Sequence, residues 1–565
     1  MIAETLACLV LVLGVAFGLS RPWVDRLRLA PAEALVAGAG LSLVAAGAVA
    51  GAVFAAGLDL SGYWLVPALA AAGLAAGWGG ARRIAADPLA RDLAVGQLIV
   101  TGWCVGWLAF VKNHSGGAWT GDAFEHWERA RFFLRDWPRG RLFIETYELP
   151  ARPPLANLLT AAFMRVTRAD YAHFQVIMTA LGSLAYLPVG LLAARFGGRP
   201  AARAAAALLM VNPLFLQNAT YPWTKLPAAF LILSGLYFFL RVRDGDGSPG
   251  RHAAACALLL GGAVVTHYSA GPYVGVLALA WAAMAWRRPG AGFVQMGAAA
   301  AAAGACVLAP WFIWSVAQYG WHTTFLSNSS VTSLDRWHGN HAVKILLNLR
   351  DTLIPAQVRG FKGVLFRQTS PWGNLRDQCF LVYQLNLPLA LGSVGCAAVL
   401  REAFRAAGAA APRDRLFWSA AIAGFVLLGF AVYGDREHYG TVHICLQSVV
   451  LLGLAFLASR WQGLGRGWRL ALIIGGTVDF LLGIALQFAV EDFALDRWLL
   501  PGRNLMEVSR TYTLVSQENL LEKIIAQLAF FADSLGTPPA LVLALLGAIL
   551  CMALVRARRA PASPA

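Results

Sequence analysis

Apolar runs of about 18 to 25 residues, separated by short polar segments, recur along most of the chain. Runs of this length and hydrophobicity cross a bilayer as helices. The pattern therefore predicts an all-α, polytopic transmembrane helix bundle with about fifteen spans. The predicted spans are residues 2–20, 33–57, 62–80, 93–111, 171–194, 201–218, 224–241, 252–267, 269–286, 293–316, 379–400, 416–433, 440–459, 468–490 and 538–555.

Arginine clusters between the spans indicate how the bundle is oriented. No basic residue precedes the first apolar run, whereas Arg21, Arg26 and Arg28 follow it, so we place the N-terminus outside. Later clusters then fall on the inside without a break in phase, down to Arg556, Arg558 and Arg559 near the C-terminus. The three long loops, 112–170, 317–378 and 491–537, are expected to face outward.

The phase of the arginine clusters holds only if residues 153–167 do not cross the bilayer. Arg152-Pro153-Pro154-Leu155 is therefore expected to open a helix that lies in the outer interface or re-enters from it. Two further stretches, His341 to Asp351 and Val508 to Phe531, are too polar to span and read as helices packed on the membrane surface.

Composition narrows the class of protein. Of 565 residues, 58% are hydrophobic and 13% are charged. The net charge of +16 arises largely from basic clusters between spans, so it predicts orientation rather than nucleic-acid binding. The eight cysteines lie in or beside spans without a Cys-x-x-Cys pair, which indicates neither a disulfide framework nor a thiolate metal site.

The chain shows no internal repeat or long linker, so we expect a single membrane domain, residues 1–565. Within it we distinguish extra N-terminal spans (1–92), a core (93–316) that contains the loop 112–170, an outer loop (317–378), and C-terminal spans (379–565) that include the outer loop 491–537.

The first long loop holds the densest group of chemically active side chains. Asp122 and His126 are four residues apart, as are Glu125 and Arg129, so a helix would bring each pair together. One interpretation is a general base or charge clamp at the outer surface. The alternative is structural: Asp122 caps a helix and Glu125, three residues later, completes a capping box.

Other polar residues stand at the predicted outer ends of spans. Lys225 could hold a phosphate there or extend to lipid head groups. His267 and Tyr268 close one span, and Arg436 and His438 belong to a polar run that closes another; side chains at one depth could line one cavity or simply be solvated.

Two further patterns concern metals and buried charge. The Asp335-x-x-His338-x-x-His341 sequence, with His322 upstream, has metal-ligand residue types, but a solvated loop explains it better because the spacing matches no established motif. The sequence indicates no cofactor with certainty and leaves a divalent metal open. Asp479 near the middle of a span should have a partner, because burying an aspartate there costs about 3 kcal/mol.

Several features occur in order between Leu93 and Arg288 and carry a resemblance to a known family. They are a span, the loop residues Gly121-Asp122 through Trp127 followed by Arg129-Ala130-Arg131-Phe132, the Pro153-Pro154-Leu155 segment, a span ending in Arg195-Phe196-Gly197, and an Asn212-Pro213 turn. In these features the chain resembles the GT-C glycosyltransferases, in particular the family 39 type related to protein mannosyltransferases and aminoarabinose transferases.

The resemblance implies an enzyme that transfers a hexosyl or pentosyl group from a polyprenyl-phosphate carrier to a lipid, glycan or protein acceptor. Asp122 would be the general base, with Glu125 and His126 beside it. Arg129, Lys225, His267, Tyr268, Arg436 and His438 are the candidate substrate-binding residues. The expected location is the bacterial inner membrane, among membrane lipids, with the site facing outside.

The chain departs from the family pattern at two places. Family members often carry a second acidic residue where this chain has Lys225, and three spans rather than one precede the span that leads to the loop. Two other functions stay open: a transporter or flippase of lipid-linked sugars, which would place polar residues near the midplane in paired halves, and an adhesion or assembly scaffold, which would not need the Asp122 cluster.

Overall fold

The computed structural model describes residues 2–111, 120–135, 137–144, 147–245, 248–287, 291–327, 341–354, 386–409, 446–484 and 530–535. Across these ranges the regular structure is helical, apart from one isolated bridge between Phe143 and Tyr147. The prediction of an all-α fold is confirmed.

The helices before the first long loop are α1 (Ile2–Gly18), α2 (Arg21–Arg26), α3 (Pro31–Ala55), η1 (Leu60–Trp64), α4 (Leu65–Ala76), α5 (Trp78–Ala86) and α6 (Pro88–Leu108). The next group is α7 (Thr120–Phe132), η3 (Leu149–Ala151), α8 (Leu155–Val166), α9 (Tyr171–Ser183), α10 (Tyr186–Gly197), α11 (Arg199–Met210), α12 (Pro213–Thr220), α13 (Lys225–Asp244), α14 (Pro249–Thr266) and α15 (Ala270–Arg287). The last group is α16 (Ala291–His322), η4 (Thr323–Ser327), α17 (His341–Leu353), α20 (Leu387–Leu391), α21 (Gly395–Ala409), α24 (Gln447–Arg460), α25 (Arg466–Ile484) and α28 (Phe531–Leu535).

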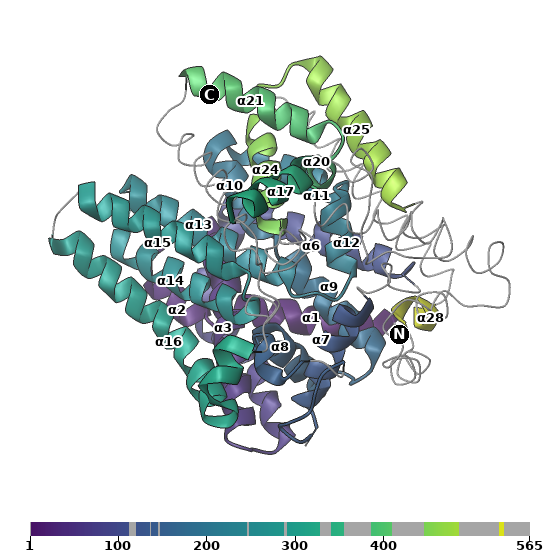
Figure 1. Ribbon diagram of the computed structural model, residues 1–565, viewed down its shortest axis with the longest axis vertical. Helices are drawn as coiled ribbons and strands as arrows, with labels where there is room; N and C mark the ends of the chain where they lie inside the picture. Colours follow the sequence, from purple (N-terminus) through teal and green to yellow (C-terminus); the bar gives the residue numbers. More distant parts are fainter. Residues whose placement is uncertain are drawn as a thin grey trace.

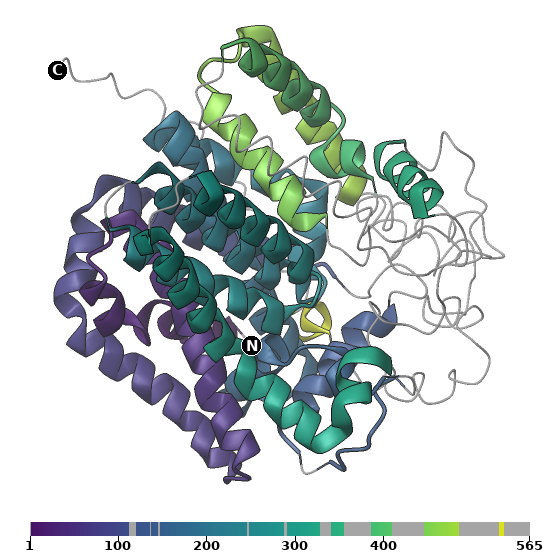
Figure 2. The ribbon, with the colours of Figure 1, turned by 60° about the vertical axis from the view of Figure 1, so that its left-hand side comes forward.

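Helices α9 to α13 form the centre of the bundle, and their side chains are almost all buried. Helices α14, α15 and α16 lie along one side, and α20, α21, α24 and α25 gather at one end (Figure 1). The N-terminal helices run along another flank of the bundle (Figure 2), where α1 packs on α9 and α3 packs on α8 and α14. The extra N-terminal helices are therefore in direct contact with the core.

Five of the described helices are long and apolar enough to cross a membrane, and a sixth span results if one bent pair is counted together. The five are Ile2–Arg26, Pro31–Ala55, Tyr171–Gly197, Lys225–Asp244 and Gly292–Leu326. The predicted spans 416–433 and 538–555 lie outside the described residues, so the count of about fifteen stays a prediction.

Two predicted spans are broken in the structure. The span predicted at 201–218 consists of α11 and α12, because Pro213 lacks the amide hydrogen that would continue a helix and Asn212 caps a new one through Phe215 N–H at 2.9 Å. The span predicted at 62–80 bends by 69° between α4 and α5. At that bend, a Cβ on Gly77 would fall 2.1 Å from Cγ of Arg21, so the turn needs glycine.

The sequence predicts three helices that do not span the membrane, and the structure describes two of them. Helix α8 begins after Pro154, as expected from the Pro-Pro segment. Its side chains are largely buried in the protein, which does not fit a helix lying on the membrane surface and leaves the re-entrant alternative as a prediction. Helix α17 agrees with the predicted His341 to Asp351 helix. The predicted Val508 to Phe531 helix lies outside the described residues except for its last two positions.

The charged residues at the predicted inner ends have protein partners. Asp92 of α6 accepts hydrogen bonds from Arg199 at 2.9 Å and from Arg203 at 3.0 Å. Asp479 of α25 likewise has the partner that its position required, because its Oδ2 accepts a hydrogen bond from the Ser393 backbone N–H at 2.6 Å. These hydrogen bonds join segments that are 86 to 111 residues apart in the sequence.

Candidate active site

Helix α7 brings the predicted acids and bases onto one wall of a buried cluster. Arg129 and Glu125 form the expected ion pair one helical turn apart, with Nη2 of Arg129 2.7 Å from Oε1 of Glu125. Both side chains are fully buried, so the pair is shielded from solvent. The spacing prediction is confirmed for this pair.

The capping interpretation of Asp122 is wrong. Helix α7 begins at Thr120, so Asp122 is already inside its first turn. The Glu125 carboxylate is held by two arginines and does not turn back to the start of the helix. Asp122 itself keeps 21% of its side chain exposed, which leaves its carboxylate reachable from outside the cluster.

Arg152 joins the two carboxylates and was missed by the sequence analysis as a site residue. Its Nη2 lies 3.2 Å from Oε2 of Glu125 and 3.8 Å from Oδ1 of Asp122. Its guanidinium also stacks over the Tyr147 ring, 4.8 Å from the centroid. One signal could have found it: Arg152 lies in a loop predicted to face outward, where the positive-inside rule does not explain an arginine.

Arg129, which is predicted to bind substrate, makes three hydrogen bonds to protein groups. Its Nε donates to Glu125 at 2.8 Å, its Nη1 donates to the Leu149 carbonyl at 2.7 Å, and its Nη2 donates to the Glu148 carbonyl at 3.0 Å. Because the guanidinium is fully buried and committed to these partners, Arg129 fixes the segment before Arg152 against α7.

Lys225 reaches the same cluster from the start of α13. Its side chain is only 3% exposed, and Nζ lies 3.2 Å from the centroid of the Trp223 ring. The preceding loop is tied to α7, because the hydroxyl of Tyr221 accepts a hydrogen bond from the Ala123 backbone N–H at 3.2 Å. A buried ammonium in this position does not extend to lipid head groups, so the snorkelling interpretation of Lys225 is wrong.

His126 contacts helix α8. Its Nδ1 is 3.1 Å from Oδ1 of Asn157 on α8. Burial lowers the pKa of His126 to about 4, although the charge of Glu125 opposes this. His126 is therefore neutral at neutral pH and a weaker base than the carboxylate of Asp122.

The remaining predicted substrate-binding residues differ in position. The Tyr268 hydroxyl donates to the Pro150 carbonyl at 3.1 Å and accepts from Nε1 of Trp311 at 3.1 Å, so Tyr268 borders the cluster. His267 accepts a hydrogen bond at Nδ1 from the Ser269 backbone N–H at 3.1 Å. Arg436 and His438 lie outside the described residues.

The charges of the cluster separate the pKa values of its two carboxyl groups. Burial raises the pKa of Asp122 to about 6; Glu125 adds to the rise, whereas Arg152 and Lys225 oppose it. Burial also tends to raise the pKa of Glu125, but the positive charges of the adjacent Arg152 and Arg129 have the larger effect and lower it. Asp122 is thus the carboxylate better suited to accept a proton near neutral pH.

The cluster also carries an excess of positive charge. Arg129, Arg152 and Lys225 face the two carboxylates Asp122 and Glu125. An anionic ligand beside Lys225 and Arg152 would meet a favourable field in a region of low dielectric.

Within the described parts of the chain, no group of three or more His, Cys, Asp or Glu side chains could hold a metal ion. The Asp335 and His338 positions of the candidate metal sequence lie outside those parts, and so does the His341 side chain.

No protein-family model matches the chain, and no curated protein matches it in sequence. Among solved structures, the chain is similar to ArnT from Cupriavidus metallidurans bound to undecaprenyl phosphate, with 16% identity and a TM-score of 0.48 over 82% of this chain and 75% of that chain. It is also similar to the Archaeoglobus fulgidus oligosaccharyltransferase in complex with Zn and sulfate, with 16% identity and a TM-score of 0.37 over 79% of this chain and 58% of that chain.

A further similar structure is the archaeal oligosaccharyltransferase AglB from Archaeoglobus fulgidus in complex with an inhibitory peptide and a dolichol-phosphate, with 15% identity and a TM-score of 0.35 over 71% of this chain and 55% of that chain.

Proposed function

We propose that this protein is a membrane glycosyltransferase that moves a sugar from a polyprenyl-phosphate donor to an acceptor hydroxyl. The observation that carries the proposal is the geometry of Asp122: a partly exposed carboxylate with a pKa near 6 lies beside two cations, Arg152 and Lys225. A base next to an anion-binding pair is the arrangement that transfer away from a lipid phosphate requires.

In the proposed reaction, the acceptor oxygen attacks the anomeric carbon of the donor sugar. The bond between that carbon and the phosphate oxygen breaks, and its electron pair leaves with the lipid phosphate. The acceptor proton passes to Asp122, which is ionised above pH 6. Lys225 and Arg152 stabilise the leaving phosphate electrostatically.

Two other residues position this machinery. Glu125 holds Arg152 through a contact of 3.2 Å, and Arg129 anchors Glu125 together with the carbonyls of residues 148 and 149. These contacts keep Arg152 close to Asp122, because a guanidinium that is paired with one fixed carboxylate has few other orientations.

We propose that the site faces the outside of a bacterial inner membrane, as the arginine pattern predicts.

Lys225→Ala is expected to weaken donor binding by roughly 10 to 100-fold, because a charge-assisted hydrogen bond contributes about 1.5–3 kcal/mol. The loss should be equal for donors that carry different sugars, since Lys225 contacts the phosphate. Binding of polyprenyl phosphate and of two lipid-linked sugars to the purified variant measures this effect.

Arg168→Ala is the matched control for Lys225→Ala, because Arg168 is also a cation of the predicted outer face but is 65% exposed and pairs with Glu4 and Asp170. The control should bind the donors as the wild-type protein does. Unchanged donor affinity in Lys225→Ala would remove Lys225 from the phosphate site.

A further inference from the structure

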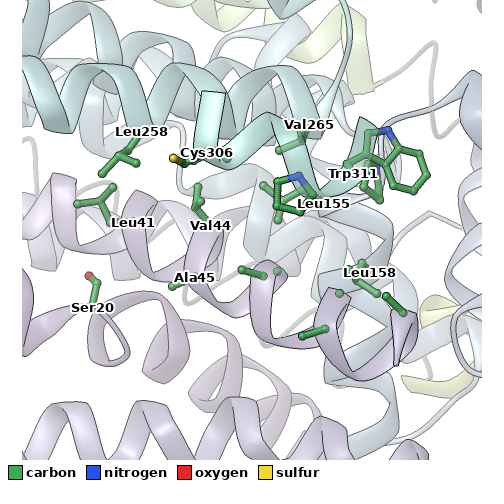
Figure 3. A pocket seen from close by; sticks show the side chains of 18 of the residues that line it. Ser20, Leu41, Val44, Ala45, Leu155, Leu158, Leu258, Val265, Cys306 and Trp311 are labelled. Carbon is green, nitrogen blue, oxygen red and sulfur yellow. The ribbon is translucent and has the colours of Figure 1, made fainter. Parts of the chain in front are cut away.

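A large apolar cavity lies between the extra N-terminal helix α3 and the core helices α8, α14 and α16. Its volume is about 700 Å³, and its lining is almost entirely hydrocarbon (Figure 3). Leu41 and Val44 of α3 line one side, and Leu258 and Cys306 line the other. A volume of this size is typical of small-molecule sites, which run to about 300–1,000 Å³.

The sequence of α3 creates the cavity. The face that α3 turns to it runs from Leu41 to Ala55 and consists mainly of residues with small side chains, including Ala45, Ala48 and Ala52. These side chains are too short to fill the space to α14 and α16. At 1.5 Å of rise per residue, this face is about 21 Å long, so an extended hydrocarbon chain could lie along it.

One end of the cavity meets the candidate active site. Pro154, which lines the cavity, follows Arg152 by two residues, and Phe133 follows Arg129 by four. Trp311, also in the lining, donates its indole N–H to Tyr268 at 3.1 Å. The apolar cavity and the charged cluster therefore share one boundary.

The rings at this end form a continuous aromatic wall. Phe54 and Phe133 pack edge to face with centroids 4.9 Å apart, and Trp314 lies 5.6 Å from Phe54 and 5.5 Å from Trp311. Such a wall favours a hydrocarbon and gives a charged group no partner.

We propose that this cavity binds the isoprenoid chain of the lipid-phosphate donor, and that α3 is one wall of the donor site. The inference rests on the proposed function for the identity of the head group. The phosphate lies at Lys225 and Arg152, where the fixed cations are, and the chain extends from there along α3. The extra N-terminal helices thereby recognise the length of the lipid chain rather than the sugar.

Cys306 provides a direct probe, because it is exposed, lines the cavity, and lies five residues, about 8 Å of helix, before Trp311. Its modification by a lipophilic maleimide can be followed by mass spectrometry of the purified protein. A polyprenyl phosphate of about eleven isoprene units, at ten times its Kd, should slow this modification about tenfold by mass action.

Geranyl phosphate, which has only two isoprene units and can fill only part of the cavity, should give less protection than the long-chain phosphate, and inorganic phosphate should give none. Equal modification rates with and without the long-chain phosphate would overturn the proposal. Equal protection by phosphatidylglycerol would also overturn it, because a bilayer acyl chain would then be the occupant.

Ala48→Trp tests the same claim without Cys306, since Ala48 is exposed to the cavity and an indole there would occupy it. Affinity for the long-chain phosphate should fall at least about tenfold, the effect of excluding about two methylene groups, while affinity for geranyl phosphate stays the same. Ala72→Trp on α4, at an exposed position outside the cavity lining, is the control and should change neither affinity.

Binding and transfer are measured separately, so the two proposals can fail separately. Chain-length-dependent binding without any sugar transfer would support the cavity inference and contradict the proposed function. Sugar transfer that is insensitive to Ala48→Trp, with Cys306 unprotected, would leave the function standing and exclude the cavity.

Discussion

Asp122→Asn is expected to lower the rate of sugar transfer by roughly 10² to 10⁴-fold while leaving folding and donor binding largely intact, because general base catalysis contributes about that much. Asparagine preserves the shape of the side chain but cannot accept the acceptor's proton. Rates measured with labelled donor at saturating concentration, with Kd determined in parallel, separate the loss of chemistry from a loss of binding.

The pH dependence should carry the signature of the same carboxylate. The pKa of Asp122 is raised to about 6, and the active form is the ionised one. The wild-type rate should therefore be constant above this value and fall as the pH decreases through 6. Asp59→Asn, at an exposed position where asparagine can still cap η1, is the control and should keep the wild-type rate and pH profile.

An Asp122→Asn variant that lost folding yet kept its specific activity per folded molecule would contradict the role of Asp122 as the base. If the residual transfer rate of that variant still fell as the pH decreased through 6, the titrating group would be a residue other than Asp122.

Arg129→Met is expected to lower the stability of the protein by about 3–5 kcal/mol, because it leaves the carboxylate of Glu125 buried with one cationic partner fewer. The carbonyls of Glu148 and Leu149 would also lose their donor. The shift of the thermal unfolding transition in detergent measures this effect.

The double variant Arg129→Met with Glu125→Gln should recover a large part of the lost stability, because the uncompensated charge is removed together with its partner. Sugar transfer should stay low in the double variant, since Arg152 has lost the fixed carboxylate that orients it. If Arg129→Met were stable and only its donor affinity fell, Arg129 would be a substrate ligand rather than a positioning residue.

The local part of the site follows from helical spacing. Glu125 and Arg129 are one turn apart in a segment that is polar enough to lie outside the spans, so the sequence predicts their ion pair and the structure contains it. Asp479 is similar: an aspartate within an apolar span requires a partner, and the Ser393 backbone N–H is that partner.

The long-range part of the site could not be predicted in this way. Tyr221 contacts Ala123 across 98 residues of sequence, and Lys225 follows the same loop into the cluster. Neither hydrophobic periodicity nor charge spacing reports which loop ends lie together. For that reason the sequence leaves Lys225 open to both the phosphate and the snorkelling interpretation, and it indicates only the start of a helix at Arg152.

The errors in the span boundaries have a common cause. A hydropathy window averages over proline and glycine, so it joined α11 to α12 across Pro213 and α4 to α5 across Gly77. The interior of the bundle supplies the contacts that make such breaks tolerable, as the hydrogen bond from Asn212 Nδ2 to the Ala390 carbonyl at 2.8 Å illustrates.

The central claim is that the sugar is cleaved from its lipid phosphate and transferred, rather than carried across the membrane intact. The most direct measurement places the purified protein in vesicles with a polyprenyl-phosphate donor labelled in both the sugar and the lipid, with and without acceptor. The account predicts that labelled sugar moves to the acceptor and free polyprenyl phosphate appears, and that Asp122→Asn stops both. Movement of intact donor between leaflets without cleavage, at equal rates in the wild type and in Asp122→Asn, would contradict it.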